Sequence, residues 1–205
     1  MKKLIAILLV LAMALSIAAC GNTKPEETTE APETTTVPET TGAPAANVPA
    51  SALEILTNIW ALFGDDEKFP IAGGNMEAGV MDAPGNYDMA YAENLPYTLY
   101  VTAEQLPSIT EAATMVHMMN ANTFTSGALR LAAGTDAAAF AQTLRDAIQN
   151  NQWICGFPEQ LVIAVVGGEY VVVAFGVTAA MSPFATKLTE AYADANILFN
   201  EAIAG

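Results

Sequence analysis

The order of apolar and polar positions divides the chain into three parts. Residues 4–19 are almost all apolar, residues 22–50 contain almost no large apolar side chain, and apolar and polar positions are mixed throughout the rest. The mixed part is long enough for one domain with its own core and too short for two. The pattern predicts a leader over 1–19, a linker over 20–50 and one folded domain over 51–205.

Three stretches of the domain have the apolar spacing that is typical of amphipathic helices. Ser51 and Glu54 have the spacing of a capping box before the first stretch. Ser182 and Pro183 have the order of an N-cap and a first helical position before the last. The predicted helices span about 51–63, 135–149 and 182–202.

Four further stretches have the length and apolar character of strands. The last two are joined across Gly167-Gly168-Glu169 and give the strongest hairpin signal in the chain. Both faces of this hairpin are apolar, so we expect it in the middle of a sheet or covered on both sides. The predicted strands span about 112–119, 123–132, 161–166 and 170–175. The order of elements predicts an α+β fold, with about three helices packed on a mainly antiparallel sheet.

Residues 64–96 are rich in Gly, Pro and Asn, which predicts one long irregular segment. Four tyrosines lie in this segment and just after it, and long loops with exposed aromatic rings recur at binding sites. The same tyrosines could equally be packing residues of the core. The candidate ligand-binding residues are Tyr87, Tyr91, Tyr97 and Tyr100.

The balance of charge excludes one class of partner. The 205-residue chain carries 22 Asp and Glu against seven Lys and Arg, a net charge of −15. Two of the seven basic residues, Lys2 and Lys3, belong to the predicted leader. A surface of this sign repels phosphate backbones, so we expect no nucleic-acid partner.

The N-terminus has the features of a secretory leader. Lys2 and Lys3 precede an apolar run that is shorter than the roughly 20 residues of a membrane-spanning helix. The run ends Ile17-Ala-Ala-Cys20-Gly, which resembles a bacterial lipobox. This resemblance implies that Cys20 is lipidated and becomes the mature N-terminus. The alternative is an ordinary signal peptide in which Cys20 is incidental.

The segment after Cys20 has the composition of a disordered spacer. Residues 22–50 hold eight threonines, five prolines and five glutamates, and they cannot bury enough apolar area to offset chain entropy. Such a spacer reaches from about 30 Å as a flexible coil to about 90 Å when extended. With a lipid on Cys20, this arrangement predicts a domain held at the extracytoplasmic face of the cell membrane.

The domain contains one histidine, His117, and one thiol, Cys155. Aromatic neighbours favour burial of Cys155 as a small core residue. The alternative is a nucleophile that His117 activates, because thiol enzymes need a base within hydrogen-bonding reach of the sulfur. Sortase-like transpeptidases also use an arginine, but Arg130 and Arg145 both precede Cys155, and the sortase motif around the cysteine is absent.

Two groups of residues raise the question of a metal site. Met115, His117 and Met119 would share one face of a strand and suit Cu(I), although a methionine-rich core strand is the favoured interpretation. The acidic candidates for Ca²⁺ lack the spacing of an EF-hand loop, so a solvated loop is favoured there. They are Asp65, Asp66 and Glu67, with Glu77, Asp82 and Asp88 further along. We therefore expect neither a metal nor a cofactor.

Three segments carry a resemblance to known proteins. The sequence HMMNANTF at 117–124, the sequence QWICGFP at 152–158 and the hairpin around Tyr170 resemble a group of small, acidic, uncharacterised lipoproteins of Gram-positive bacteria. The likeness covers about residues 69–192. It implies a location in the cell envelope and assigns no catalytic residue.

The chain thus combines the features of a surface-displayed protein, a predicted lipidation site and a long spacer, with few residues that could carry out catalysis. The sequence predicts a membrane-anchored, extracytoplasmic interaction or ligand-binding module, whose partner is an envelope protein or a small ligand. The alternative is a thiol-dependent cell-envelope enzyme that uses Cys155 and His117.

Overall fold

The computed structural model describes residues 49–75, 77 and 79–204 of the chain. They all belong to one compact unit. The predicted leader, its lipidation site Cys20 and all but the last two residues of the predicted linker lie outside the described residues. Among the helices that are described, none combines the length and the apolar character needed to cross a membrane.

The described residues form four α-helices, two short 3₁₀ segments and eight strands. The α-helices are α1 (Ala52–Ala61), α2 (Leu95–Leu99), α3 (Ala137–Gln149) and α4 (Thr178–Ala191). The 3₁₀ segments are η1 (Met89–Asn94) and η2 (Leu106–Ser108). The strands are β1 (Ile71–Gly73), β2 (Val80–Met81), β3 (Gly85–Tyr87), β4 (Ile109–His117), β5 (Phe124–Leu131), β6 (Gln160–Val166), β7 (Tyr170–Gly176) and β8 (Asn196–Ala202).

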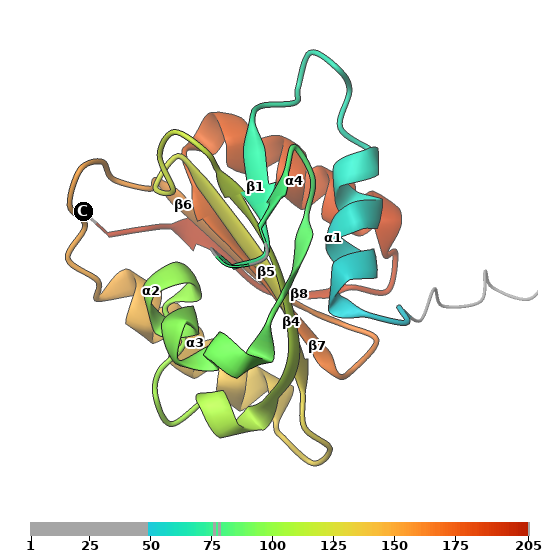
Figure 1. Cartoon of the computed structure of the whole chain (residues 1–205), viewed down its shortest axis with the longest axis vertical. Helices are drawn as coiled ribbons and strands as arrows, with labels where there is room; N and C mark the ends of the chain where they lie inside the picture. Colours follow the sequence, from blue (N-terminus) through green and yellow to red (C-terminus); the bar gives the residue numbers. More distant parts are fainter. Residues whose placement is uncertain (1–48, 76, 78, 205) are drawn as a thin grey trace, which may run out of the picture. The chain divides into compact units, whose positions relative to one another are not determined.

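All eight strands belong to one antiparallel sheet. Seven lie in the order β2-β1-β4-β5-β7-β6-β8, and β3 pairs with β4 beside β1. Helices α1 and α4 pack on one face of the sheet, and α2 and α3 lie on the other (Figure 1). The predicted α+β fold with an antiparallel sheet and packed helices is confirmed.

The β6–β7 hairpin explains why the sheet needs helices on both faces. Along β7, side chains alternate between the two cores: Val172 packs with α1 and α4, whereas Val171 and Val173 pack on the side of α2 and α3. All seven residues of β7 are buried. Gly167 and Gly168 in the turn both have positive φ, which a tight hairpin turn requires. The predicted central hairpin is confirmed.

Two of the three predicted helices begin close to the expected positions, each at a capping side chain. The hydroxyl of Ser51 accepts a hydrogen bond from the Glu54 N–H at the start of α1. The carboxylate of Asp136 accepts from two backbone N–H groups at the start of α3, as expected of an N-cap. Helix α3 has the expected amphipathic spacing, because Phe140, Leu144 and Ile148 follow each other at intervals of four and are all buried.

The predicted helix over 182–202 is wrong at both ends. Helix α4 begins one turn earlier, at Thr178, and Pro183 lies inside it. The earlier start buries Ala180 and Met181 against the sheet, and the carboxylate of Glu159 accepts a hydrogen bond from the Thr178 N–H. Burial of this extra turn outweighs the proline signal for a helix start.

The C-terminal part of that segment is a strand rather than a helix. Helix α4 ends at Ala191, and β8 pairs antiparallel with β6. Leu198 and Phe199 fit helical spacing, but a short apolar run cannot be assigned to helix or strand from periodicity alone. The open edge of β6 decides the outcome, because its backbone N–H and C=O groups need partners.

The predicted irregular segment 64–96 is also wrong, since it contributes β1, β2 and β3 to the sheet. Its glycines conceal the strands. A Cβ atom at Gly73 would overlap the backbone of Gly85, and a Cβ atom at Gly85 would overlap that of Gly73. The close approach of β1 and β3 therefore requires the residues that usually mark a loop.

Candidate functional site

A cavity of about 470 Å³ opens on the face of the sheet that carries α2 and α3. Its floor is one row of residues that are aligned across four neighbouring strands. The row consists of Ala72 of β1, Val116 of β4, Thr125 of β5 and Phe175 of β7. Helix α3 packs over β6, β7 and β8, and α2 has only five residues, so neither helix fills the space above this row.

The walls of the cavity come from segments that are distant in the sequence. Gly73 to Asn75 and Glu77 form one wall, and Asn94 to Tyr100 around α2 form another. Ala121 and Asn122, between β4 and β5, form a third. The cavity is thus built by the region that looked irregular in the sequence, together with the turn after β4.

Three of the four candidate tyrosines line this cavity: Tyr87, Tyr97 and Tyr100. Tyr87 is buried, Tyr100 is half-buried and Tyr97 is 82% exposed. Tyr91 lies half-buried in η1 and is not among the described lining residues. The tyrosines are therefore packing residues and wall residues at once, with Tyr97 the most accessible ring.

Close packing of α2 against β5 sets the position of the wall that carries Tyr97 and Tyr100. A Cβ atom at Gly127 would overlap the side chain of Leu99, so the glycine allows α2 to lie directly on the strand. Tyr100 ends the helix with φ of 60°, a left-handed conformation that is unusual for tyrosine. The ring of Tyr100 packs edge-on against Trp153 and Phe175, which fixes it at the cavity floor.

The opposite wall contains a polar pair, Asn75 and Glu77, of which the sequence singled out only Glu77, as an acidic candidate for Ca²⁺. Asn75 is buried, and its Nδ2 donates a hydrogen bond of 3.0 Å to Oε2 of Glu77. The buried Oδ1 of Asn75 accepts no hydrogen bond from the described residues. In the sequence, the run from Gly73 to Asn75 is too short for a phosphate loop, and its role becomes visible only when β1 is placed beside β4.

Two buried threonines hold the backbone of the cavity walls. The hydroxyl of Thr114 donates to the carbonyl of Gly74 at 2.8 Å, and that of Thr125 donates to the carbonyl of Ala121 at 2.9 Å. Both threonines are almost fully buried, so these bonds satisfy hydroxyls that would otherwise be costly to bury. Two walls of the cavity are therefore tied to β4 and β5.

The charge around the cavity is acidic. None of the described residues that line it is Lys, Arg or His. Burial raises the pKa of Tyr87, and the carboxylates of Glu77 and Glu93 raise it further, against a side-chain hydrogen bond with Thr98 that lowers it. Burial likewise raises the pKa of Tyr100. Both phenols are therefore neutral hydrogen-bonding groups at ordinary pH.

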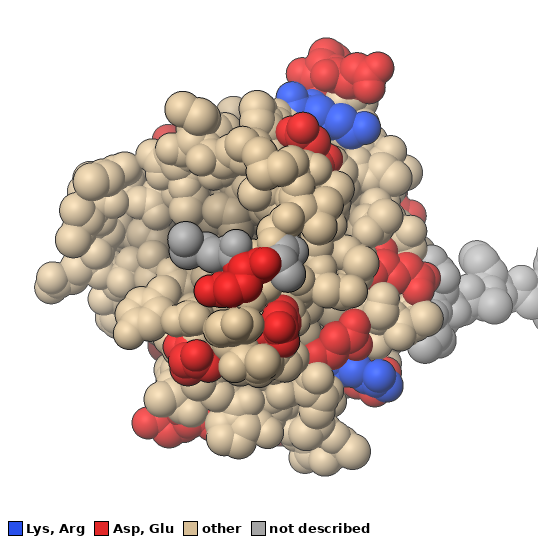
Figure 2. Space-filling model, viewed as in Figure 1, with Lys and Arg blue, Asp and Glu red and all other residues tan. Residues whose placement is uncertain are grey.

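On the face shown in Figure 2, the basic atoms lie in two groups, each beside acidic atoms. Lys187 and Arg130 each form an ion pair. Lys187 contacts Glu67 at 3.1 Å, and Arg130 contacts Glu169 at 3.1 Å. The remaining charges on this face are acidic and scattered. An anionic ligand would therefore meet few positive charges on its approach to the cavity.

Cys155 is exposed, so its interpretation as a buried core residue is wrong. Its φ of 62° is left-handed, and its neighbours Ile154 and Phe157 are exposed as well. The side-chain amide of Asn120 donates to the carbonyl of Cys155 at 3.1 Å, and that of Asn122 donates to the carbonyls of Ile154 and Gly156. These bonds bring together the two loops that carry the resemblance.

His117 lies at the end of β4 in a structural role. Its Nδ1 accepts hydrogen bonds from the backbone N–H groups of Met119 and Asn120, and its ring stacks on Phe69. A neutral imidazole with Nδ1 engaged in this way carries its proton on Nε2, so it has no free lone pair for a thiol. Among the described residues, no hydrogen bond joins Cys155 to His117. The geometry does not assemble a thiol–imidazole pair.

The metal candidates are not assembled either. Glu67 accepts a hydrogen bond from the Gly64 N–H and pairs with Lys187, and these contacts lower its pKa. Met115 is fully buried, whereas Met119 lies beyond the end of β4 and is 83% exposed. In the part of the chain that the structure describes, no three His, Cys, Asp or Glu side chains come together as metal ligands.

Comparisons with known proteins return no relatives: no family model, curated protein or solved structure is significantly similar to this chain.

Proposed function

We propose that this protein is a lipid-anchored, extracytoplasmic binding protein that takes up a small ligand in the tyrosine-lined cavity. The observation that carries the proposal is the cavity itself. A volume of about 470 Å³ falls within the range of small-molecule sites, which are mostly apolar with a few polar groups. Here Tyr87, Tyr97 and Tyr100 supply aromatic surface, and Asn75 and Glu77 supply the polar groups.

The anchor and spacer support the extracytoplasmic part of the proposal. The lipobox-like run ending at Cys20 and the Thr/Pro/Glu-rich segment that follows it are typical of a domain tethered to a membrane. The resemblance to small envelope lipoproteins supports the same location. A binding protein held in this way can capture a ligand without leaving the cell.

The cavity can be tested with a fluorescent probe. A chain of residues 21–205 keeps the whole compact unit and omits the predicted leader and Cys20. We expect saturable binding of the neutral, apolar probe N-phenyl-1-naphthylamine. Ala121→Trp places an indole at the cavity wall from an exposed turn position, so it should abolish binding and leave the fold intact.

The matched control is Ala133→Trp, which makes the same change at another exposed turn residue outside the cavity lining. This variant should bind the probe as the unmodified chain does. Equal binding by the two variants, or no saturable binding by the unmodified chain, contradicts the proposed cavity function.

The anchor is tested separately in a Gram-positive host that expresses the full chain. Metabolic labelling with an alkyne fatty acid should mark the protein, and Cys20→Ser should remove the label and release the protein from the membrane fraction. A label that persists in the variant would rule out Cys20 as the lipidation site.

A thiol-dependent enzyme is the second candidate, and the exposure of Cys155 is the observation that favours it. If the thiol is activated, alkylation in the native protein has a pH midpoint well below the free-thiol value of about 8.5, and His117→Ala raises that midpoint. A midpoint that His117→Ala does not move argues against the enzyme, because His117 is the base that this candidate requires.

A further inference from the structure

The cavity has a polarity that restricts the chemistry of its ligand. We propose that the ligand is a small organic cation, an alkylammonium group attached to an apolar or aromatic body. This inference rests on the proposed binding function and assigns its ligand class. It is carried by three features of the cavity: a carboxylate in one wall, tyrosine rings around it and the absence of basic residues from its described lining.

Glu77 is the charged group that would pair with the ammonium. Its Oε2 accepts from Asn75, and its Oε1 accepts no hydrogen bond from the described residues. Because the amide donates through Nδ2, its acceptor Oδ1 faces away from the carboxylate. The amide cannot be reversed without turning Oδ1 towards Glu77. Oδ1 itself has almost no accessible surface, so the acceptor that this pair offers to a ligand is Oε1 of the exposed Glu77.

An ammonium group matches such a wall better than other polar groups do. It carries three N–H donors, no acceptor and a positive charge, so it can both donate to the carboxylate and neutralise its charge. An alcohol has one donor and no charge. A carboxylate on the ligand would leave Oε1 of Glu77 unfilled and be repelled by its charge.

The aromatic walls favour the same ligand class. Tyr97 is accessible, and the rings of Tyr87 and Tyr100 line the cavity beside it. Cations are attracted to the faces of aromatic rings, and clusters of such rings recur in sites for organic ammonium ions. Thus the rings can contact both the apolar body of the ligand and its charged end.

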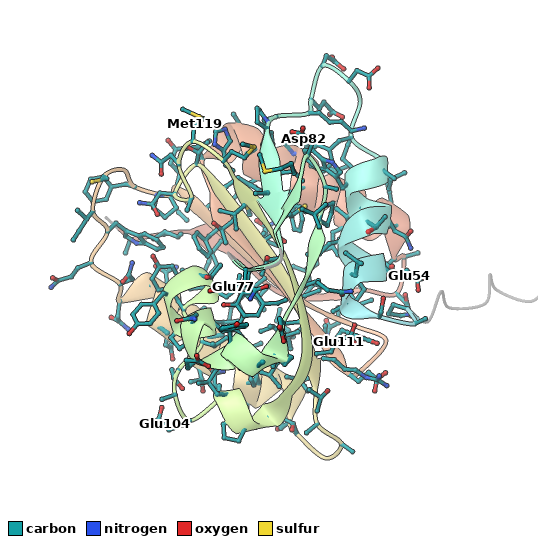
Figure 3. All side chains as sticks on the ribbon, in the orientation of Figure 1. Glu54, Glu77, Asp82, Glu104, Glu111 and Met119 are labelled. Carbon is teal, nitrogen blue, oxygen red and sulfur yellow. The ribbon has the colours of Figure 1, made fainter. Side chains whose placement is uncertain are left out.

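The electrostatic field of the whole domain also favours a cationic ligand. Residues 49–204 contain 17 acidic and four basic residues. A negative surface raises the local concentration of cations and the rate at which they reach a site. Figure 3 shows Glu77 beside α2 near the middle of the viewed face, whereas Glu104 lies at the lower left edge. The site carboxylate can therefore be separated experimentally from the general charge.

The test uses three indole compounds of similar size and different charge: tryptamine, tryptophol and indole-3-acetate. Isothermal titration calorimetry on residues 21–205 should give at least tenfold tighter binding of tryptamine than of tryptophol, and no measurable binding of indole-3-acetate. Glu77→Gln should weaken tryptamine binding about tenfold and leave tryptophol binding unchanged, because one charged pair is lost while the shape is kept.

The matched control is Glu104→Gln, which removes the same charge from an exposed residue outside the cavity lining. It should change tryptamine binding less than twofold at physiological salt. Equal affinities for tryptamine and tryptophol, or equal effects of the two Gln variants, overturn the cation assignment. If the naphthylamine probe binds and only Ala121→Trp removes it, the cavity function stands even when the cation assignment fails.

Discussion

The β6–β7 hairpin and the pair of loops at 118–122 and 152–158 both contain several large apolar side chains, which are buried in the hairpin and mostly exposed in the loops. In the hairpin, the residues of β7 are buried without exception. In the loop pair, Met119, Ile154 and Phe157 are 83%, 78% and 66% exposed.

The difference comes from what fixes each backbone. The hairpin is held by ladder hydrogen bonds and by cores on both faces. The loop pair is held by the side-chain amides of Asn120 and Asn122, which bond to backbone carbonyls across the two loops. Polar bonds of this kind fix a backbone without burying the apolar side chains beside it. Hydropathy therefore predicts burial correctly in paired strands. It fails in loops whose backbone is held by side-chain amides.

The largest expected effect comes from the same substitution made in α4, which packs in the core on one face of the hairpin, and in the loop pair. Phe184 is fully buried and packs edge-on against Phe124, whereas Phe157 is 66% exposed. Phe184→Ala should lower the free energy of unfolding by about 3–5 kcal/mol, and Phe157→Ala should change it by less than about 0.5 kcal/mol. Urea unfolding of both variants measures the contrast. Similar losses would mean that the loop is part of the core.

A second variant tests the point where the scaffold meets the cavity wall. Gly127→Ala would place a methyl group against the side chain of Leu99, so α2 must move from β5. We expect a loss of about 1–3 kcal/mol in the free energy of unfolding and weaker naphthylamine binding. In a Leu99→Ala background the same change should cost less, because the overlap is gone. A cost that is independent of Leu99 would refute this account of the helix position.

The buried tyrosines of the scaffold predict how stability depends on alkaline pH. Burial raises the pKa of Tyr192, and a hydrogen bond from Asn58 lowers it in part. The folded state therefore favours the neutral phenol. Its contribution is fully present below the unfolded pKa of about 10 and is lost as the pH rises beyond that value.

Urea unfolding midpoints between pH 8 and 11 should consequently fall at the upper end of the range, and Tyr192→Phe should flatten the fall. The variant loses the bond from Asn58, so its curve starts lower but declines less steeply. An unchanged slope in the variant would show that ionisation of Tyr192 does not contribute.

The smallest effect is expected in the loops, where Cys155 has a left-handed backbone. Asparagine tolerates this conformation and a β-branched residue does not. Cys155→Asn should raise the free energy of unfolding by about 0.5 kcal/mol, and Cys155→Val should lower it by at least as much. Thermal unfolding of the two variants decides the matter. If they rank in the reverse order, side-chain contacts outweigh backbone strain at this position.

The sequence predicted part of the candidate site. The tyrosines were found because several aromatic residues gather in a glycine-rich segment, and three of the four line the cavity. Asn75 was not found, and Glu77 was considered only as a Ca²⁺ candidate, because one amide and one carboxylate two residues apart have no distinctive pattern. Thr125 and Phe175 could not be found either, since only the strand register places them side by side on the cavity floor.

The fold was predicted where local signals and packing agree. Capping residues fixed the starts of α1 and α3, and apolar strands on both sides of two glycines fixed the central hairpin. The errors occur where a local signal is overruled. Pro183 marks a helix start by itself, but burial of Ala180 and Met181 extends α4 past it.

The sequence by itself determined the class of the fold, the central hairpin and the acidic charge, because these follow from periodicity, turn residues and composition. Only the tertiary structure decided that residues 71–87 add three strands to the sheet, that the segment 196–202 pairs with β6, and that a cavity lies over one cross-strand row. Strand pairing satisfies backbone groups whose partners are distant in the chain, and no local pattern records which partner is nearest.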